Sequence, residues 1–353
     1  MKESHLKIFA GVFVFLGILY FITKPRHASV NLDEFVQNIV LGISKDDVAS
    51  LEVYKQTSTE QPIQMIFAKK GDQWFIPTKF NAKAKKSSVD RLLTDILEMT
   101  GKVRSSDPKH FDTYHISDEQ GLHLLLKDET DKTLANLIIG KRAEDYSTGF
   151  VRFAGKDKVF AVDKNLLSGL SIYGDVDTLS QFKVDTFVDL EAVDQDKEKL
   201  NMVGVVANGK EVVIERIEKE VEVPGDSAKT IQKEFEWVLL KGKGKKIKLD
   251  QKEVANFFRD VAKIRAQEVV DRIGDTFADL NKSSIYGFNR PSHYIVFRKP
   301  DGAQNNVLFG KEYEKDQGYY MNVQYEGLVY KVTKYNFDKI FKWIEELPKK
   351  VAK

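Results

Sequence analysis

Cysteine is absent from this sequence of 353 residues. Its absence excludes disulfide scaffolds, thiolate zinc sites, cysteine nucleophiles and lipidation of an N-terminal cysteine. An excess of charge of one sign is also missing, because 55 lysines and arginines balance 53 aspartates and glutamates to a net charge of +2. With no global basic field, we expect no nucleic-acid partner.

Recognisable catalytic and cofactor-binding motifs are scarce too. The six histidines include one loose group, His110, His115 and His123, whose spacing does not suit a metal site on a helix. No G-x-S-x-G pentapeptide, dinucleotide-binding glycine motif or EF-hand loop occurs. Close acid pairs such as Asp175 and Asp177 are expected by chance among 53 acidic residues. The sequence therefore predicts no enzyme, no metal site and no cofactor.

The most apolar stretch lies near the N-terminus, where residues 8–22 read IFAGVFVFLGILYFI. A helix over residues 6–23 would span roughly 27 Å, close to the thickness of a thin hydrocarbon core. A cleaved signal peptide and a buried helix are the alternatives, but the following Lys24, Pro25 and Arg26 are a poor context for signal-peptide cleavage. We predict an uncleaved, single-pass membrane anchor over residues 1–24.

Basic residues flank this span almost equally on both sides, so the positive-inside rule gives only a weak orientation. An N-terminal anchor usually sends a long C-terminal body across the membrane, and a body without cysteine fits that compartment. We therefore expect a protein of the inner, cytoplasmic membrane with its body on the extracytoplasmic, periplasmic side. A juxtamembrane linker is expected over residues 25–47, with an amphipathic helix at residues 35–43.

The body contains one pattern of apolar residues twice. Each time, an alternating strand with a tryptophan precedes a helical stripe, and a Gly-Lys pair and a last strand follow. Trp74 and Trp237 lie 163 residues apart and the two Gly-Lys pairs lie 170 apart, so the order and spacing are kept. We predict an α+β fold of two tandem, duplicated modules, at residues 48–183 and 184–353, each a mainly antiparallel sheet with one or two amphipathic helices.

The expected elements follow from these patterns. The first helix carries the stripe Val89, Leu92, Leu93 and Ile96 behind Ser87 as N-cap, and the second carries Val254, Phe257, Phe258 and Val261 behind Asp250. A last helix is expected to end at Pro348, and the charged stretch 218–232 to extend one hairpin. Strands are expected at residues 51–54, 63–67, 74–76, 122–126, 134–139, 150–153, 159–162, 203–206, 212–217, 235–239, 294–297, 307–309, 319–323 and 328–332.

The same features resemble a known family. They are the N-terminal anchor, the tryptophan strand before a helix, the segments Tyr114-His-Ile116 and Tyr286-Gly-Phe288, the Gly-Lys turn and a final Val-x-x-Val strand. Together they resemble the bacterial family called domain of unknown function 4340, over roughly residues 48–345. Members of that family are often encoded beside ABC-type exporters and gliding-motility-like auxiliary proteins. The resemblance therefore implies an envelope role near a transporter and supplies no catalytic residues.

Two groups of side chains are candidate contact sites. Tyrosine buries area at low entropy and keeps a polar tip, so the late tyrosines are candidate partner contacts, although they also suit ordinary strand packing. The lysine-rich turn after residue 240 is a candidate contact for an anionic surface, or a plain hairpin tip. Trp74 and Trp237 are expected in the core. The candidate contacts are Tyr313, Tyr319, Tyr320 and Tyr325, and Lys241, Lys243, Lys245 and Lys246.

These observations favour a non-enzymatic, membrane-anchored envelope protein that binds or scaffolds a membrane complex. Its expected partners are the membrane, through the single span, and another protein. The family resemblance implies that this partner protein is an ABC-type exporter. The alternatives are an envelope hydrolase or a solute-binding module that uses a cleft between the two modules.

Overall fold

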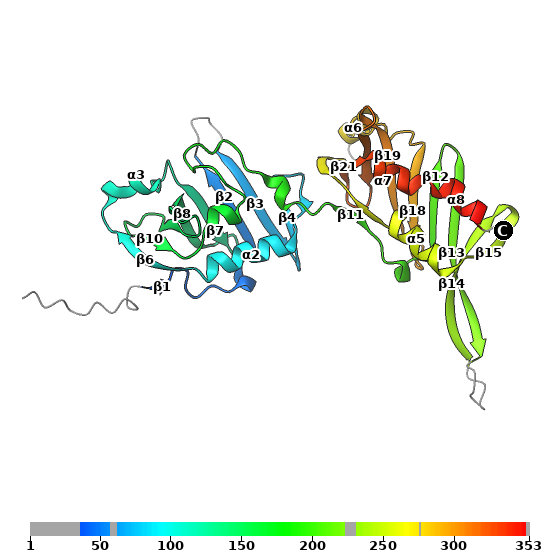
Figure 1. Ribbon diagram of the computed structural model, residues 1–353, viewed down its shortest axis with the longest axis horizontal. Coiled ribbons are helices and arrows are strands. Elements are labelled where there is room, and N and C mark those ends of the chain that lie inside the picture. The colour runs from blue at the N-terminus through cyan, green and yellow to red at the C-terminus, as the bar shows by residue number, and fades with distance from the viewer. Residues whose placement is uncertain (1–35, 57–61, 223–230, 275–276, 351–353) are drawn as a thin grey trace, which may run out of the picture.

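The computed structural model describes residues 36–56, 62–222, 231–274 and 277–350. Two large antiparallel sheets with helices packed on them form an α+β fold, as the sequence predicts. The sheets belong to two bodies that follow each other along the chain, one drawn blue to green and the other green to red (Figure 1). We call them the first and the second module.

The first module contains a sheet of ten strands in the order β1-β6-β10-β9-β8-β7-β2-β3-β4-β5. Its strands are β1 (Gln37–Asn38), β2 (Ser50–Lys55), β3 (Ile63–Lys70), β4 (Gln73–Ile76), β5 (Ala82–Lys83), β6 (Thr100–Ser105), β7 (Leu122–Lys127), β8 (Thr133–Arg142), β9 (Gly149–Phe153) and β10 (Val159–Val162). Its α-helices are α2 (Lys86–Leu97), α3 (Phe111–Tyr114) and α4 (Leu166–Gly169).

The second module contains a sheet of nine strands in the order β15-β14-β13-β12-β18-β19-β20-β21-β17. Its strands are β12 (Met202–Ala207), β13 (Lys210–Glu222), β14 (Ile231–Lys241), β15 (Lys245–Lys248), β17 (Glu268–Arg272), β18 (His293–Arg298), β19 (Gln304–Glu314), β20 (Gly318–Val323) and β21 (Leu328–Thr333). Its helices are α5 (Gln251–Val261), α6 (Phe277–Tyr286), α7 (Lys334–Phe341) and α8 (Trp343–Lys350), and a separate pair joins β11 (Glu191–Asp194) to β16 (Lys263–Arg265).

The two sheets have the same strand order. Read from β5 and without the edge strand β1, the first sheet runs β5-β4-β3-β2-β7-β8-β9-β10-β6. The second, read from β15, runs β15-β14-β13-β12-β18-β19-β20-β21-β17. Each strand of the first series has a counterpart at the same place in the second. The helix that follows the tryptophan strand, α2 or α5, also has the same place in the chain order.

Each sheet has an inner face, packed against the long helices, and an outer face. The apolar stripes of α2 and α5 are buried against the inner faces, and Trp74 and Trp237 are 1% and 6% exposed, which confirms their core positions. The short segments around α3 and α6 cover part of the outer faces. In β8, Leu137 and Ile139 join the main core while Ile138 joins a small outer cluster under α3, as strand alternation requires.

Three local expectations are wrong. Residues 36–43 contain strand β1 at the edge of the first sheet, where Gln37 pairs with Gly101, and no helix. Helix α2 begins at Lys86, before the expected cap Ser87, because Ala84 is paired with Val188 and the helix starts directly after that bridge. Pro348 lies inside α8; proline removes one backbone hydrogen bond there, yet the helix continues to Lys350.

The long hairpin was expected and is present. Strands β13 and β14 pair from Val213 with Leu240 out to Glu222 with Ile231, and their far half extends beyond the rest of the sheet (Figure 1). The predicted anchor over residues 1–24 lies outside the described residues. Among the described residues, no helix combines the length and apolar character that a membrane span needs.

Candidate protein-docking surface

The four candidate tyrosines do not form one patch. Tyr313 and Tyr320 lie on the outer face of the second module, where their ring centroids are 5.8 Å apart. The adjacent Tyr319 points to the inner face and stacks on Phe337 of α7, with ring centroids 3.8 Å apart. This opposite orientation of Tyr319 and Tyr320 is the one that strand alternation predicts.

Tyr325 lies apart from both groups, in the turn between β20 and β21. Its hydroxyl accepts a hydrogen bond from Nε2 of Gln195, over 3.1 Å. Burial, followed by the charge of Glu326, raises the pKa of Tyr325 to about 12. Tyr325 therefore belongs to the junction near the start of the second module, and we remove it and Tyr319 from the candidate docking surface.

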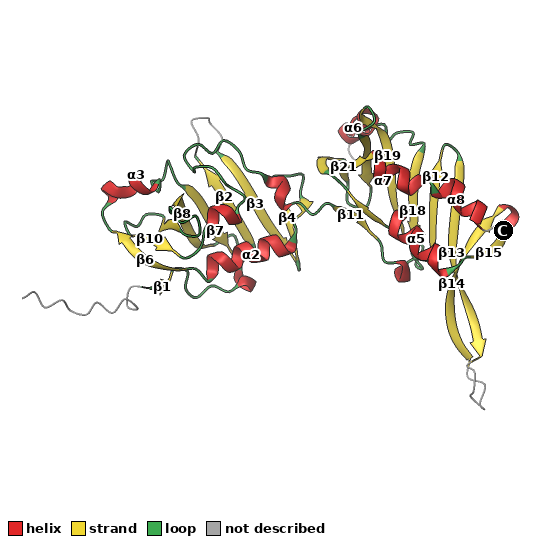
Figure 2. Cartoon of the chain, in the orientation of Figure 1, coloured by secondary structure: helices red, strands yellow, loops and turns green. Residues whose placement is uncertain are grey.

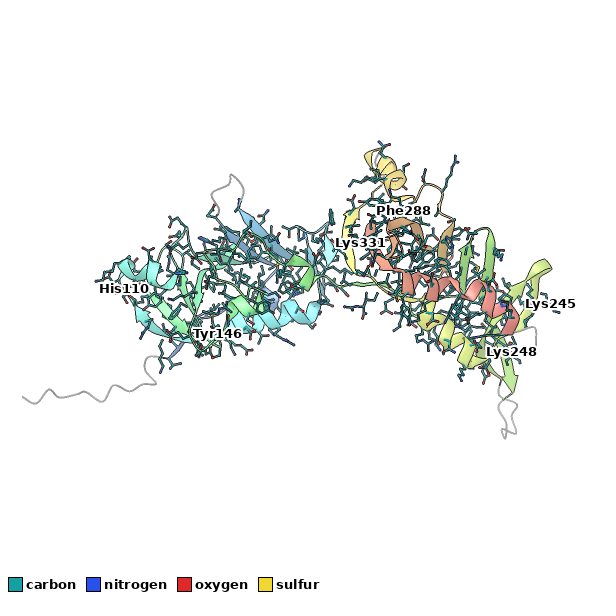
Figure 3. All side chains as sticks on the ribbon, turned by 45° about the horizontal axis from the view of Figure 1, so that its top comes forward. His110, Tyr146, Lys245, Lys248, Phe288 and Lys331 are labelled. Carbon is teal, nitrogen blue, oxygen red and sulfur yellow. The ribbon has the colours of Figure 1, made fainter. Side chains whose placement is uncertain are left out.

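A third tyrosine joins the outer pair. Tyr286, the last residue of α6, lies with its ring centroid 4.8 Å from that of Tyr320 in an edge-to-face contact. We call Tyr286, Tyr313 and Tyr320 the outer tyrosine cluster. All three rings are partly exposed, and they come from α6, β19 and β20. Figure 3 shows Phe288 and Lys331, which label this part of the second module.

Hydrogen bonds fix two of the three hydroxyls. Tyr286 donates to Oδ2 of Asp271 over 3.0 Å, and Tyr313 donates to Oε1 of Gln267 over 2.6 Å. Burial and the hydrogen bond to Asp271 raise the pKa of Tyr286 to about 12. Burial also raises the pKa of Tyr313. Both hydroxyls are therefore neutral donors at neutral pH.

Charged side chains surround the cluster in pairs. Nζ of Lys331 lies 3.0 Å from Oε2 of Glu268 and 5.5 Å from the centre of the Tyr313 ring. Nζ of Lys282 lies 2.8 Å from Oδ1 of Asp271. Burial alone would raise the pKa of Asp271, but hydrogen bonds from Lys282, the Arg272 N–H and Tyr286 outweigh it and lower that pKa. The surface thus presents fixed aromatic rings between paired charges.

A glycine allows α6 to approach the sheet at this place. A Cβ added to Gly310 of β19 would lie 2.0 Å from the carbonyl oxygen of Tyr286, so no larger residue fits without movement of the chain. The first module has the same contact, because a Cβ on Gly140 would lie 2.3 Å from the carbonyl oxygen of Tyr114. The two Tyr-x-[IF] segments noted in the sequence are therefore the segments that cover the outer faces.

The outer face of the first module differs in its side chains. Tyr114 contacts Phe150, with ring centroids 4.6 Å apart, and Ala161 lies where the second module has Lys331. A hollow of about 690 Å³ borders this place, lined by Tyr114, Phe150 and Ala161 together with the basic residues Arg104, Lys141 and Arg142 among others. The cluster of three tyrosines is thus specific to the second module.

The lysine-rich turn is a hairpin tip, one of the two predicted readings. Lys241 and Lys245 pair across β14 and β15 at its base. Nζ of Lys246 lies 2.9 Å from Oε2 of Glu215, so one of the candidate lysines is already neutralised. The side chain of Lys243 lies outside the described residues. Because β15 is an edge strand, these lysines also hinder strand pairing with another chain.

The three clustered histidines have separate surroundings. Nδ1 of His110 lies 2.9 Å from Oγ of Ser105, and His123 stacks on Tyr54 with ring centroids 4.6 Å apart. Nδ1 of His115 lies 3.7 Å from Oδ1 of Asp177. Within the described residues, no group of three histidine, aspartate or glutamate side chains converges as metal ligands.

Comparison with known proteins adds a family. Residues 74–281 match the family described as Domain of unknown function (DUF4340). The chain belongs to this family. The match runs from β4 of the first module into α6 of the second and confirms the resemblance that the sequence motifs indicate.

Other comparisons add little. No curated protein matches the chain. A crystal structure from Vibrio parahaemolyticus, of a domain provisionally described as an outer membrane lipoprotein-sorting protein, is similar at 10% identity over 81% of each chain, with a TM-score of 0.13. A likeness at this level carries no inference about the fold or function of this chain.

Proposed function

We propose that the protein is a non-enzymatic binding or scaffolding component of a membrane complex, and that the outer tyrosine cluster is its docking surface for a protein partner. The carrying observation is that Tyr286, Tyr313 and Tyr320 form one partly exposed aromatic surface, in which Asp271 holds the hydroxyl of Tyr286 and Gln267 that of Tyr313. Rings held in place before binding lose little entropy at an interface, and tyrosine is a frequent binding hot spot.

The membrane placement is part of the same proposal. Its support is the apolar stretch over residues 8–22, which lies outside the described residues. We propose a single-pass anchor in the inner membrane, a periplasmic body, and an ABC-type exporter as the complex, the last on the basis of family resemblance. Intact-mass analysis of the membrane fraction checks the anchor, because a mature N-terminus beyond residue 28 would contradict it.

We also propose that the two modules are copies of one unit. The shared strand order and the equivalent contacts of Gly140 and Gly310 support duplication. Superposing residues 48–170 on residues 203–345 should bring both tryptophan strands and both helices α2 and α5 into register. Helices on different faces of their sheets would contradict a common origin.

The junction of the modules gives a reason to prefer binding over hydrolysis in an intermodule cleft. Arg272 of the second module donates from Nε to the Phe80 carbonyl over 2.7 Å and from Nη2 to the Asn81 carbonyl over 3.2 Å. Lys83 also pairs with Glu326. Direct contacts thus occupy the place where a cleft enzyme would need open space.

The test is recovery of the complex from detergent-solubilised membranes with tagged full-length protein. Replacing Tyr320 or Tyr313 by alanine should reduce partner recovery several-fold, because a buried tyrosine anchor contributes about 2 kcal/mol or more at an interface centre. Tyr335→Ala is the matched control, since Tyr335 is 75% exposed and lies on α7, away from the cluster.

The thermal midpoint separates docking from folding in this test. Tyr320→Ala should leave it nearly unchanged, whereas Tyr319→Ala should lower it, because Tyr319 stacks on Phe337. Neutralising Lys243 and Lys245 should change mainly salt-sensitive binding to anionic vesicles. If the lysine changes abolish partner recovery and the tyrosine changes have no effect, docking is electrostatic and the proposed surface is wrong.

A further inference from the structure

The second module contains a buried carboxylate whose partners come from the last two helices. Asp260 of α5 is 2% exposed. Its carboxylate lies 3.1 Å from Nζ of Lys339 and 3.1 Å from Nζ of Lys342, and it accepts a hydrogen bond from Nε1 of Trp343 over 3.2 Å. In the first turn of α5, Oε2 of Glu253 lies 2.7 Å from Nζ of Lys350. Helices α7 and α8 therefore dock on α5 through lysines and one tryptophan.

The first module has the same carboxylate without these partners. The stripes of α2 and α5 align at a separation of 165 residues, from Val89 and Val254 to Ile96 and Val261, which places Asp95 at the position of Asp260. The same separation places Ser88 at the position of Glu253. Asp95 is partly buried and has no ion pair or side-chain hydrogen bond within the part of the chain that the structure describes.

The two lysines have no counterparts in the first module. The final strands align at a separation of 170 residues, so Gly169 of α4 lies at the position of Lys339 and presents no side chain to Asp95. The chain then turns at Ser171, whose φ of 61° is left-handed, where the second module continues into Lys342 and Trp343. The chain returns over this side of the module at Val184–Phe187, where Phe187 is 3% exposed and packs against Phe67. This segment covers the apolar part of the place that α7 and α8 take in the second module, and a polar hollow remains beside Asp95.

The polar hollow beside Asp95 has a volume of about 490 Å³. Ser88 and Asp95 of α2 line it, which are the two positions that contact α7 and α8 in the second module, and Gly169 lines it from the opposite side. The rest of the lining is mostly polar and consists of Arg91, Tyr146, Ser147, Asn165, Ser168, Ser171, Thr186 and Phe187. Tyr146, labelled in Figure 3, is 69% exposed.

We propose that this hollow receives lysine side chains from a helix of a partner protein, in the way that Asp260 of α5 holds Lys339 and Lys342 within the second module. The unpaired carboxylate of Asp95 would receive the ammonium group, and the serine hydroxyls would accept or donate the remaining hydrogen bonds. Arg91 does not exclude a lysine, because Asp260 holds two lysines beside Arg259, whose Nε lies 3.1 Å from the same carboxylate.

This inference extends the binding role proposed above to a second surface, on the other module. The two surfaces share no residue, so they fail separately. If the tyrosine variants lose partner recovery but still bind the peptide, both surfaces are supported as independent sites. If the tyrosine variants keep partner recovery and still bind the peptide, the tyrosine surface is wrong and the Asp95 site is supported.

The probe is a synthetic peptide with the sequence of residues 334–350, labelled at its N-terminus and titrated into full-length protein in detergent micelles, with empty micelles as blank. Fluorescence anisotropy should show binding to the wild-type chain. Asp95→Asn should weaken that binding by about tenfold or more, because an ammonium would lose its charged partner. Asp90→Asn, on the same helix but outside the hollow, is the control.

A second measurement needs no peptide. Gly169→Lys should place an ammonium beside Asp95, raise the thermal midpoint relative to Gly169→Ala and block the peptide, and Asp95→Asn should cancel that rise. No binding of the peptide, equal binding of a peptide with glutamine in place of Lys339 and Lys342, or no rise for Gly169→Lys would each overturn the proposal. Displacement of the peptide by free spermidine would assign the hollow to small amines and would likewise overturn a helical partner.

Discussion

At the scale of single residues, the pair Asp260 and Asp95 shows how partners decide the effect of a carboxylate on stability. Burial alone would raise the pKa of Asp260, but hydrogen bonds from Lys339, Lys342 and Arg259 outweigh it and lower that pKa. Removing one partner of a buried charged network leaves the others uncompensated, which is costly.

We therefore expect Asp260→Ala to lower the free energy of unfolding by about 3 kcal/mol. This value is at the lower end of the loss expected when one partner of a buried ion pair is removed, because the lysines are partly exposed. Asp95→Ala, its counterpart without partners, should change it by no more than about 0.5 kcal/mol. Urea denaturation followed by tryptophan fluorescence measures both. Equal losses in the two variants would mean that the lysine contacts of Asp260 do not contribute.

His293 should make stability depend on pH. Its ring packs against Phe337 and Phe341, with centroids 4.9 Å and 4.7 Å away, and burial lowers its pKa below the ordinary value. A histidine with a lowered folded-state pKa stabilises the fold above its unfolded pKa of about 6.5, and this contribution is lost as the pH falls through the folded value.

The expected result is a thermal midpoint that falls from pH 7 to pH 5 more steeply in the wild type than in His293→Gln. Glutamine keeps a polar side chain of similar reach and cannot gain a proton in this range. Parallel curves for the two proteins would show that His293 is protonated in the folded state without cost.

The sequence pattern predicts which way Tyr319 and Tyr320 face, but it does not predict the partners of the buried carboxylate. Adjacent Tyr319 and Tyr320 had to face opposite sides of a strand, and they do. By contrast, the sequence gives no sign that Tyr286 joins Tyr320, or that Asp260 meets Lys339, because both contacts link segments distant in sequence. The repeated Tyr-x-[IF] segment was the one available signal for Tyr286.

At the scale of elements, the two outer-face covers depend on glycine. Gly140→Ala and Gly310→Ala should each destabilise the protein by about 1–3 kcal/mol, because the added methyl group would meet the carbonyl oxygen of Tyr114 or Tyr286 and force the cover away from the sheet. Gly174→Ala is the control, since a Cβ there meets no atom within 4 Å. Thermal unfolding of the three variants tests this, and a loss in only one module would count against equivalent construction.

The elements that the sequence predicted are those with strong apolar periodicity. The stripes of α2 and α5 and the alternating strands β7 and β12 carry their own signal. The elements that were not predicted have no such periodicity. Strand β6 reads TGKVRS with one buried residue, and α6 reads FADLNKSSIY without a clear apolar stripe. Both are held by neighbours, β6 by pairing with β10 and α6 by its contacts at Asp271 and Gly310.

At the scale of the whole molecule, the two modules meet through few side chains. Arg272 is central, because Nη1 donates to the Glu326 carbonyl within its own module while Nε and Nη2 reach Phe80 and Asn81 of the other. Phe80 and Asn81 both have left-handed backbone, with φ of 55° and 53°, which turns their carbonyls outward. No sequence pattern indicates this junction, because nothing in the sequence distinguishes Arg272 from the other arginines.

We expect Arg272→Ala to loosen the relative orientation of the modules without unfolding either one. Hydrogen bonds from a charged donor contribute about 1.5–3 kcal/mol each, and this change removes two that cross the junction. Because the chain has no cysteine, spin labels can be placed at Glu98→Cys and Glu211→Cys, one exposed site in each module. The distance distribution from double electron–electron resonance should broaden in Arg272→Ala and keep its width in the control Arg290→Ala, with thermal midpoints close to wild type in both. An unchanged distribution in Arg272→Ala would mean that Lys83, Glu326 and the connecting chain fix the orientation without Arg272.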